Sequence, residues 1–367
     1  MQDLSICVDI GGTFTDLVLA DTTGNLVAVE KVLTTPRDLE SGAIQGIEQL
    51  LSSQNIAPER VSVVVHATTQ TSNTLIERSG AKTALVTTEG FADILEMGRE
   101  SRYDVYDLFI KLPAPLVPRE HRFEVPERIL ANGDLLRPID VEAVRLVAEE
   151  LLSEGIESVA VCFLHAYRNP AHERQAKDLL RDAGYGGPIL LSSDVCPEIR
   201  EFERATTTVA NAYLSPRMES YLRNFETRLR KINIDAPFQL FSSYGGRLTV
   251  HAAERRPVEM LECGGAAGVM VAAAMAQALK WPLALSFDMG GTTAKAALIK
   301  DGQPQLTRSY EVARMARFVS GSGLPISASA IDLIEIGAGG GSLAGVDALG
   351  LITVGPESAG GDPGPAC

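Results

Sequence analysis

The feature that constrains this chain most is a short motif that occurs twice. Residues 6–16 are ICVDIGGTFTD and residues 285–295 are LSFDMGGTTAK, so an Asp-apolar-Gly-Gly-Thr pattern begins at Asp9 and again at Asp288, 279 positions later. Each copy lies between two apolar runs, which predicts a strand, a tight turn and a second strand. We interpret the pair as one hairpin in each of two related domains.

The residue types in these turns suit the binding of phosphate groups. Glycines carry no side chain, so backbone N–H groups can approach an anion closely, and threonine hydroxyls add further donors. Asp9 and Asp288 suit a hydrated Mg²⁺ or a catalytic water, and we predict them as catalytic and metal-binding residues. The predicted phosphate-binding residues are Gly11, Gly12, Thr13, Thr15, Gly290, Gly291, Thr292, Thr293 and Lys295. An ordinary hairpin turn is the alternative for one copy, and the duplication argues against it.

A third glycine-rich segment supports a nucleotide site. Residues 335–346 are EIGAGGGSLAGV, which suits close packing against a purine or ribose, and the candidate contacts are Gly337, Gly339, Gly340, Gly341 and Ser342. The same segment also fits a GxGxxA dinucleotide fingerprint with Glu357 downstream. That alternative requires a long helix after the glycines, and GVDALGLITVG does not predict one. No GxxxxGK[ST] pattern occurs, which disfavours a Walker-type ATPase.

Alternating strands and helices predict an α/β fold with two or three domains in 367 residues. Apolar periodicity predicts helices over about 38–53 and 203–232, and residues 263–280 form a helix that begins with glycines. Strands that pair directly around the Gly-Gly turns predict mixed sheets. Residues 100–138, with five prolines, are expected to be irregular.

Composition excludes several classes of protein. A formal charge of −14 makes nucleic acid an improbable partner. Five scattered cysteines without CxxC spacing indicate neither a zinc site nor a disulfide framework. The N-terminus has no basic segment of a signal peptide, and the apolar run 266–279 is too short to span a bilayer. We therefore expect a cytoplasmic protein without a membrane segment.

Other residues allow two interpretations each. His66, Thr68, Thr69 and Asn73 follow a buried-type strand, where they either contact substrate or phosphate or fix the loop. Arg99 either binds a polar substrate or forms a surface ion pair. Cys263 begins a helix, where the position favours a thiolate but Glu262 opposes it, so packing or anion binding through nearby amides is the preferred reading.

The motifs together resemble a known superfamily. VDIGGTFTD, FDMGGTTAK and IGAGGGSLA resemble the phosphate-1, phosphate-2 and adenosine motifs of the actin, Hsp70 and sugar kinase superfamily. More narrowly, the chain resembles the hydantoinase A/5-oxoprolinase family, which includes N-methylhydantoinase A and is related to acetone and acetophenone carboxylase subunits. The stretches that carry this resemblance are 66–100, 158–173, 198–216 and 354–367.

The resemblance implies an actin-like ATPase fold with two lobes, 1–200 and 201–367, the second incomplete. It implies ATP and Mg²⁺ as cofactors and ATP-dependent hydrolysis of a cyclic amide of hydantoin or 5-oxoproline type, through phosphorylation of the substrate. A ketone carboxylase subunit and a truncated, non-catalytic nucleotide-binding or assembly subunit remain alternatives. A hydantoinase B-like partner subunit and an oligomer are expected.

The chain departs from the family pattern at several points. Lys295 stands where many members have an acidic residue, and the usual SGPAAGV-like and SNGG stretches are CGGAAGV at 263–269 and SYGG at 243–246. Family chains normally continue beyond GPAC, so a fragment, a split-gene subunit or a shortened paralogue is expected. These departures leave the exact reaction open.

Overall fold

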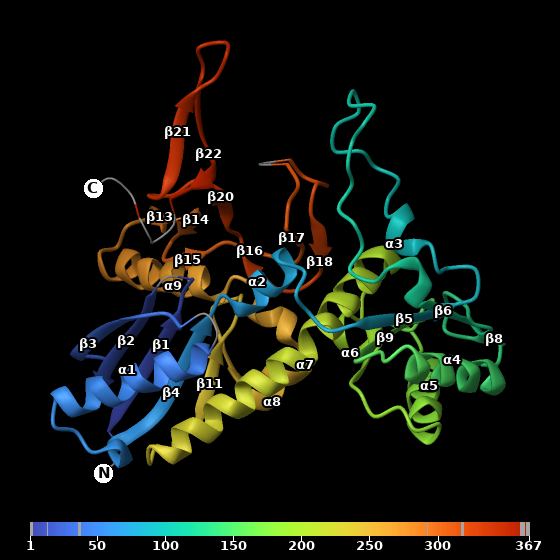
Figure 1. Cartoon of the computed structure of the whole chain (residues 1–367), viewed down its shortest axis with the longest axis horizontal. Coiled ribbons are helices and arrows are strands. Elements are labelled where there is room, and N and C mark those ends of the chain that lie inside the picture. The colour runs from blue at the N-terminus through green and yellow to red at the C-terminus, as the bar shows by residue number, and fades with distance from the viewer. Residues whose placement is uncertain are drawn as a thin grey trace.

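The computed structural model describes residues 3–12, 14–35, 38–291, 293–316, 319–359 and 364. Three main sheets organise the chain: one at the lower left of Figure 1, one at the right and one at the upper left. The mixed α/β architecture predicted from the sequence is confirmed, because parallel and antiparallel pairs occur in one sheet.

The first sheet has six strands in the order β12-β11-β4-β1-β2-β3. β4 pairs in parallel with both β1 and β11, and the remaining pairs are antiparallel. Alternating apolar residues of β1 and β2 are buried against α1 and α7, which gives the largest apolar core of the described chain. The strands are β1 (Leu4–Ile10), β2 (Phe14–Asp21), β3 (Leu26–Leu33), β4 (Val61–Thr68), β11 (Phe238–Phe241) and β12 (Arg247–Thr249). The covering helix α1 spans Leu39–Ser53 and is capped by the Asp38 side chain, which accepts from the Ser41 backbone N–H.

The second sheet is entirely parallel, in the order β10-β9-β5-β6. Every residue of β5 and β9 is buried, as expected for strands covered on both faces. The strands are β5 (Thr83–Thr88), β6 (Arg122–Val125), β9 (Ser158–Cys162) and β10 (Ile189–Leu191). Helices α4 (Val141–Ser153) and α5 (Ala171–Asp182) pack on this sheet.

The long helix α7 (Glu201–Lys231) connects the first two sheets. Its first half packs against β9 and its second half packs against α1 (Figure 1). This position explains why residues 203–215 are all buried, whereas a surface helix would bury only one stripe.

The third sheet contains β13 (Leu283–Met289), β14 (Ala294–Lys300), β15 (Gln303–Pro304) and β20 (Ile334–Ile336). Helix α9 (Cys263–Ala278) packs on one face, through Ala266, Val269 and Ala273. On β13 the alternate residues Leu283, Leu285 and Phe287 are more than half exposed, so the opposite face is apolar and open.

Shorter elements complete the described chain. The helices are α2 (Gln70–Ile76), α3 (Ile94–Met97), α6 (Ser192–Val195) and α8 (Val250–Arg255), with 3₁₀ turns at 58–60, 119–121 and 257–260. The strands are β7 (Arg128–Ile129), β8 (Leu135–Arg137), β16 (Leu306–Thr307), β17 (Tyr310–Val312), β18 (Leu324–Ile326), β19 (Ala330–Ile331), β21 (Ser342–Val346) and β22 (Ile352–Ser358). Within the described ranges, no helix is both long and apolar enough to cross a membrane.

One expectation about organisation differs from the structure. Residues 100–138 were expected to be irregular, but β6, β7 and β8 lie within them, and β6 joins the second sheet by pairing with β5. Pairing between distant strands is not revealed by local sequence patterns. The division into lobes 1–200 and 201–367 stays a prediction, and β11 and β12, which follow residue 200, extend the first sheet.

Candidate functional site

The first repeated motif forms the turn between β1 and β2. Asp9 lies on β1 opposite Asp16 on β2, and the Gly11 N–H donates to the Phe14 carbonyl oxygen across the turn at 3.0 Å. A β-carbon on Gly12 would have no neighbour within 4 Å, so the tip of the turn is open. The predicted strand–turn–strand unit is therefore present, with its glycine backbone accessible.

The second motif forms the equivalent turn between β13 and β14. Asp288 lies opposite Lys295, and the Gly290 N–H donates to the Thr293 carbonyl oxygen at 2.9 Å. Each of these four residues follows its counterpart in the first hairpin by 279 positions, so the duplication in sequence is also a duplication in backbone geometry. One difference is chemical, because Lys295 takes the position of Asp16.

The two hairpins meet at the N-terminus of α9. A β-carbon on Gly264 would lie 3.5 Å from Oδ1 of Asp9, and one on Gly265 would lie 3.0 Å from Cδ of Lys295. The first turn of α9 thus lies beside one hairpin at Gly264 and beside the other at Gly265. A side chain at Gly265 would press on the Lys295 side chain, whereas one at Gly264 would make an ordinary contact with Asp9.

Asp9 has a strongly altered acidity. Its surroundings raise its pKa to about 6, first because they remove the carboxylate from water and then because Asp16 and Asp288 are negatively charged. Lys295 and Lys31 act in the opposite direction. Asp9 is nevertheless among the exposed residues of the first hairpin. Asp288, from the second hairpin, is therefore close enough to affect Asp9, from the first.

Lys295 is held by acidic residues that the sequence analysis did not assign to the site. Its Nζ forms an ion pair with Glu262, which precedes α9, and lies 4.0 Å from Oε1 of Glu335 on β20. Burial alone would lower the pKa of Lys295, but Glu262 and Glu335 outweigh burial and the net pKa is raised. The lysine therefore remains a cation beside Asp9. From the sequence alone, Glu262 was considered only as the neighbour of Cys263.

The glycine-rich loop after β20 lies against the second hairpin. The Gly340 N–H donates to the Gly290 carbonyl oxygen at 2.9 Å, and the Gly341 N–H donates to the Gly291 carbonyl oxygen at 2.8 Å. The Ser342 hydroxyl accepts from the Gly339 N–H at 2.9 Å. The amides of Gly340 and Gly341 thus hold the loop to the hairpin, and contact of Gly337, Gly339, Gly340, Gly341 and Ser342 with a nucleotide stays a prediction.

The predicted threonine contacts have different outcomes. Thr13 and Thr292 lie outside the described residues. Thr15 is fully buried, with its hydroxyl 3.1 Å from the Thr34 hydroxyl, so its place in the fold accounts for it without a phosphate. Thr293 lies in the second turn, where its carbonyl oxygen closes the turn.

Thr68, Thr69 and Asn73 lie beside the first hairpin, at the end of β4 and in α2. The Thr69 N–H donates to the Ile10 carbonyl oxygen at 3.3 Å, and the Asn73 Nδ2 donates to the Thr69 hydroxyl at 3.4 Å. Asn73 is exposed, whereas Thr68 is buried. Thr69 and Asn73 are thus placed at the rim of the site, where a role in ligand contact remains a prediction.

His66 lies in the apolar core and not in the cleft. Its ring is fully buried, with Nδ1 3.1 Å from the Val8 carbonyl oxygen and Nε2 2.7 Å from the Tyr221 hydroxyl. It stacks on Phe225 and Phe238, and burial lowers its pKa to about 4. These contacts fit a residue that fixes the core and leave none of its ring for a substrate.

Cys263 is a buried structural residue. Its Sγ donates to the Thr68 carbonyl oxygen at 3.2 Å and accepts from the Thr68 N–H at 3.3 Å. Burial raises the pKa of the thiol to about 12, so the helix N-terminus does not produce a thiolate. These contacts fit the packing interpretation, in which Cys263 joins the start of α9 to the end of β4.

Arg99 lies in another part of the molecule, where it forms an ion pair with Glu203 of α7 and lines a separate cavity. No contact among the described residues joins Arg99 to the glycine turns.

The carboxylates of the site are a pair and not a larger cluster. Within the described part of the chain, no group of three or more His, Cys, Asp or Glu residues is arranged to hold a metal ion. Asp9 and Asp288 come from the two hairpins, and the charge of Asp288 raises the pKa of Asp9. Two carboxylates with exposed amides fit a Mg²⁺ that keeps several waters and shares phosphate oxygens, which is the usual arrangement of nucleotide-bound magnesium.

Comparison with known families agrees with this geometry. A model of the hydantoinase/oxoprolinase N-terminal region matches residues 5–184, and a hydantoinase/oxoprolinase model matches residues 204–367. Together they cover most of the chain.

Similar proteins occur in distant organisms. A protein of Methanocaldococcus jannaschii is 40% identical over 98% of this chain and 53% of its own length. Caprolactamase subunit alpha of Pseudomonas jessenii is 32% identical over 100% of this chain and 52% of its own. The acetophenone carboxylase gamma subunit of Aromatoleum aromaticum is 32% identical over 99% of this chain and 50% of its own. The chain thus spans about half the length of these relatives.

Two solved structures share the fold. The ATP-dependent caprolactamase of Pseudomonas jessenii superposes with a TM-score of 0.84 at 31% identity, over 99% of this chain and 52% of that one. Nucleotide-free acetone carboxylase superposes with a TM-score of 0.81 at 25% identity, over 98% and 52%. The sequence matches and the fold lead to one conclusion: the chain belongs to the hydantoinase/oxoprolinase family.

Proposed function

We propose that this protein binds Mg²⁺-ATP between its two glycine hairpins and uses it to phosphorylate a small cyclic amide, which is then hydrolysed. The observation that carries the proposal is the meeting of the hairpins at α9. A β-carbon on Gly264 would lie 3.5 Å from Oδ1 of Asp9 and one on Gly265 would lie 3.0 Å from Cδ of Lys295, and Asp9 responds to the charge of Asp288. A triphosphate in this cleft would have open glycine backbone on both sides.

The electrostatics of the cleft fit a metal-bound nucleotide better than a free anion. Asp9 and Asp288 would repel bare phosphate, whereas a divalent cation between them and the phosphates removes that repulsion. Bound there, Mg²⁺ would neutralise charge on the phosphate oxygens. The N–H groups at the start of α9 and the cation of Lys295 then face the remaining negative charge.

The proposed reaction needs positioning more than a strong protein nucleophile. The carbonyl oxygen of the amide forms a bond to the γ-phosphorus while the bond from that phosphorus to the bridging oxygen breaks, and ADP leaves with the electron pair. A water adds to the activated carbon and the ring C–N bond breaks, which leaves an amine and an acyl phosphate. A second water releases phosphate and the carboxylate.

A ketone carboxylase subunit is the second candidate. The gamma subunit of acetophenone carboxylase is as similar to this chain as caprolactamase subunit alpha is, at 32% identity each. The same cleft would serve both reactions, because both depend on transfer of a phosphoryl group to an oxygen. Phosphate release that requires bicarbonate would indicate the carboxylase, whereas phosphate release without bicarbonate would indicate the amide hydrolase.

We also propose that the protein works with a partner of the hydantoinase B type. Two of its relatives are named as subunits, and the open apolar face of β13 is a surface that another polypeptide can cover. Light scattering after size-exclusion chromatography, with the protein alone and mixed with such a subunit, tests this. Separate elution of the two proteins would contradict it.

The test of the proposed function is calorimetric titration with Mg²⁺-ATP, followed by phosphate release in the presence of hydantoin, caprolactam, 5-oxoproline, or acetone with bicarbonate. The assays use the protein alone and with its partner subunit.

Asp288→Ala should abolish turnover and leave the circular dichroism spectrum unchanged. Asp301→Asn, in the turn at the other end of β14, is the matched control and should keep turnover. Full turnover by folded Asp288→Ala would refute the assignment. Nucleotide binding without turnover on any substrate would favour the non-catalytic alternative.

A further inference from the structure

Lys295 has a carboxylate neighbour on each side within its sheet. It lies directly opposite Asp288 of β13 and directly opposite Glu335 of β20, and both strand pairs are antiparallel. Residues so placed share a face of the sheet, and their side chains are close enough to interact favourably when the charges are opposite. Lys295 could therefore form a cross-strand ion pair with either carboxylate.

The first hairpin shows what such a position produces elsewhere in the chain. Asp16 of β2 lies directly opposite Lys31 of β3, and the Lys31 Nζ is 2.6 Å from Oδ1 of Asp16. The second hairpin differs, because within the described residues no ion pair joins Lys295 to Asp288. The lysine is thus turned away from one of its two cross-strand neighbours.

Glu262 is the carboxylate that holds Lys295 most closely. Its Oε2 forms an ion pair with the Lys295 Nζ, and less than a fifth of each side chain is exposed. Glu335 contributes more weakly, because its Oε1 is 4.0 Å from the Nζ and nearly half of its side chain is exposed. Charges attract each other more strongly where water is mostly excluded, so Glu262 has the stronger hold on the lysine.

The backbone around Glu262 fixes the position of this carboxylate. Glu262 has a φ of 59° and a ψ of 20°, a left-handed conformation that residues other than glycine seldom adopt. Its N–H donates to the Ser72 hydroxyl at 3.2 Å, and the next residue, Cys263, hydrogen-bonds the backbone of Thr68. Glycine adopts this conformation without strain, so the presence of glutamate indicates a role for its side chain.

A lysine paired with Asp288 would compete with a metal ion for the same carboxylate oxygens. The ammonium is near both aspartates of the site, because burial raises the pKa of Asp9 and Lys295 is close enough to act against that rise. A lysine side chain is long and flexible, and it can reach more than one carboxylate from one backbone position. Another carboxylate must therefore hold the lysine if the aspartates are to keep their charge for a metal.

We propose that Glu262 is a positioning residue, which holds Lys295 away from Asp288 and so leaves that carboxylate free to bind the metal of the nucleotide. This inference rests on the proposed function. Glu262 itself contacts neither the metal nor the nucleotide, because it acts through the lysine.

The test compares Glu262→Gln with the wild type in ADP binding, measured by calorimetry with Mg²⁺ and again with EDTA in place of Mg²⁺. In the variant Lys295 should pair with Asp288, so Mg²⁺-ADP should bind about tenfold more weakly. ADP without metal should bind no more weakly than it does to the wild type, whereas loss of a purely structural contact would weaken both. In a Lys295→Met background the same substitution should leave Mg²⁺-ADP affinity unchanged, because no lysine remains to compete.

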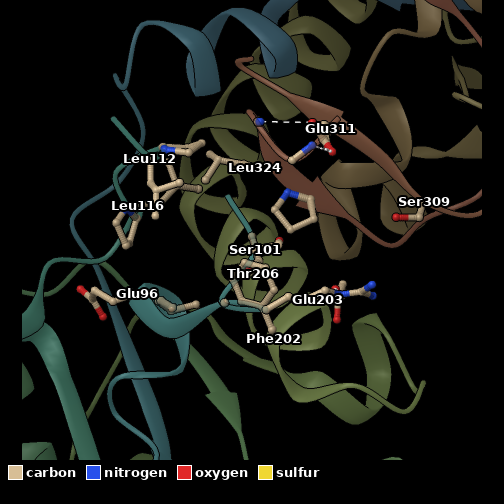
Figure 2. A pocket seen from close by; sticks show the side chains of 18 of the residues that line it. Glu96, Ser101, Leu112, Leu116, Phe202, Glu203, Thr206, Ser309, Glu311 and Leu324 are labelled. Atoms are coloured by element: carbon tan, nitrogen blue, oxygen red, sulfur yellow. Dashed lines mark hydrogen bonds and ion pairs between the residues drawn. The ribbon is translucent and has the colours of Figure 1, made fainter. Parts of the chain in front are cut away.

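Glu203→Gln is the matched control. Glu203 of α7, which Figure 2 shows in the wall of a separate cavity, is also mostly buried and ion-paired, with Arg99, and no described residue that lines this cavity belongs to either hairpin. This control should leave Mg²⁺-ADP affinity unchanged. A Glu262→Gln protein that binds Mg²⁺-ADP like the wild type, or that loses the same affinity in the Lys295→Met background, would overturn the proposal.

Two further measurements keep the proposal falsifiable. If circular dichroism shows that Glu262→Gln does not fold, Glu335→Gln takes its place and should show the same change at smaller size, and no change there would overturn the proposal. In a nucleotide-free crystal structure of Glu262→Gln, the Lys295 Nζ should move to within ion-pair distance of Asp288, and an ammonium that stays beside Glu335 would contradict the inference. If the wild type does not bind Mg²⁺-ADP, the proposed function is refuted, and this structure still decides whether Glu262 keeps the lysine from Asp288.

Discussion

The acidity of Asp9 gives a direct prediction about the distance between the hairpins. Its pKa of about 6 arises from burial, then from Asp16 on the neighbouring strand, then from Asp288 on the other hairpin. At pH 5 a group with this pKa is only about a tenth ionised, whereas an ordinary aspartate is more than nine-tenths ionised. Removal of either neighbouring charge should lower the pKa of Asp9, with Asp16→Asn acting more strongly than Asp288→Asn.

The assay is a carboxyl-carbon NMR titration of protein that carries ¹³C-labelled aspartate. The Asp9 resonance is assigned by its absence from Asp9→Asn. Lys295→Met should raise the pKa of Asp9, because it removes a cation that lowers it. Asp21→Asn is the control, since Asp21 lies at the far end of β2 and hydrogen-bonds Thr23 and Asn25 in its own turn.

Two results would refute this reasoning. If the Asp9 carboxyl titrates near pH 4 in the wild type, the surrounding protein does not desolvate the carboxylate. An unchanged titration in Asp288→Asn would show that the second hairpin is too far away to affect it. Magnesium-dependent nucleotide binding should weaken as pH falls through 6, because Asp9 becomes protonated.

Two further predictions concern stability. His66 is neutral in the folded protein down to a pKa of about 4, whereas in the unfolded chain it takes up a proton near pH 6.5. Protons therefore favour the unfolded state, and His66 should cost about 2 kcal/mol of unfolding free energy by pH 5 relative to pH 8. Urea unfolding at both pH values measures this, and an equally steep loss in His66→Gln would contradict it. A β-carbon on Gly80 would overlap the Tyr213 ring, so Gly80→Ala should cost roughly 1–3 kcal/mol and lower the thermal midpoint. Gly186→Ala, where a β-carbon meets nothing within 4 Å, is its control, and similar midpoints for the two variants would show that the ring moves freely.

Helices and turns whose signals lie within a few residues of the sequence were predicted from local patterns. The helix predicted over 38–53 is α1 (Leu39–Ser53), because its apolar residues recur at helical spacing and Asp38 caps it. Both hairpins were predicted from the glycine turns that separate two apolar runs. The proximity of the hairpins followed only from the interpretation of the duplication, and in the structure both lie beside the first turn of α9.

Residues whose roles depend on distant partners were missed or misplaced. The end of a buried strand does not reveal which side chain faces a helix 155 positions later, so the sequence left both a ligand contact and a structural role open for His66, which bonds Tyr221. Glu262 pairs with a lysine 33 positions away on another element.

The most direct test of the account is a crystal structure of the protein with Mg²⁺ and a non-hydrolysable ATP analogue. The account predicts phosphate density between the turn at Gly11–Gly12 and the turn at Gly290–Gly291, with the metal between Asp9 and Asp288. An analogue bound elsewhere, or one that touches only one of the two turns, would contradict it.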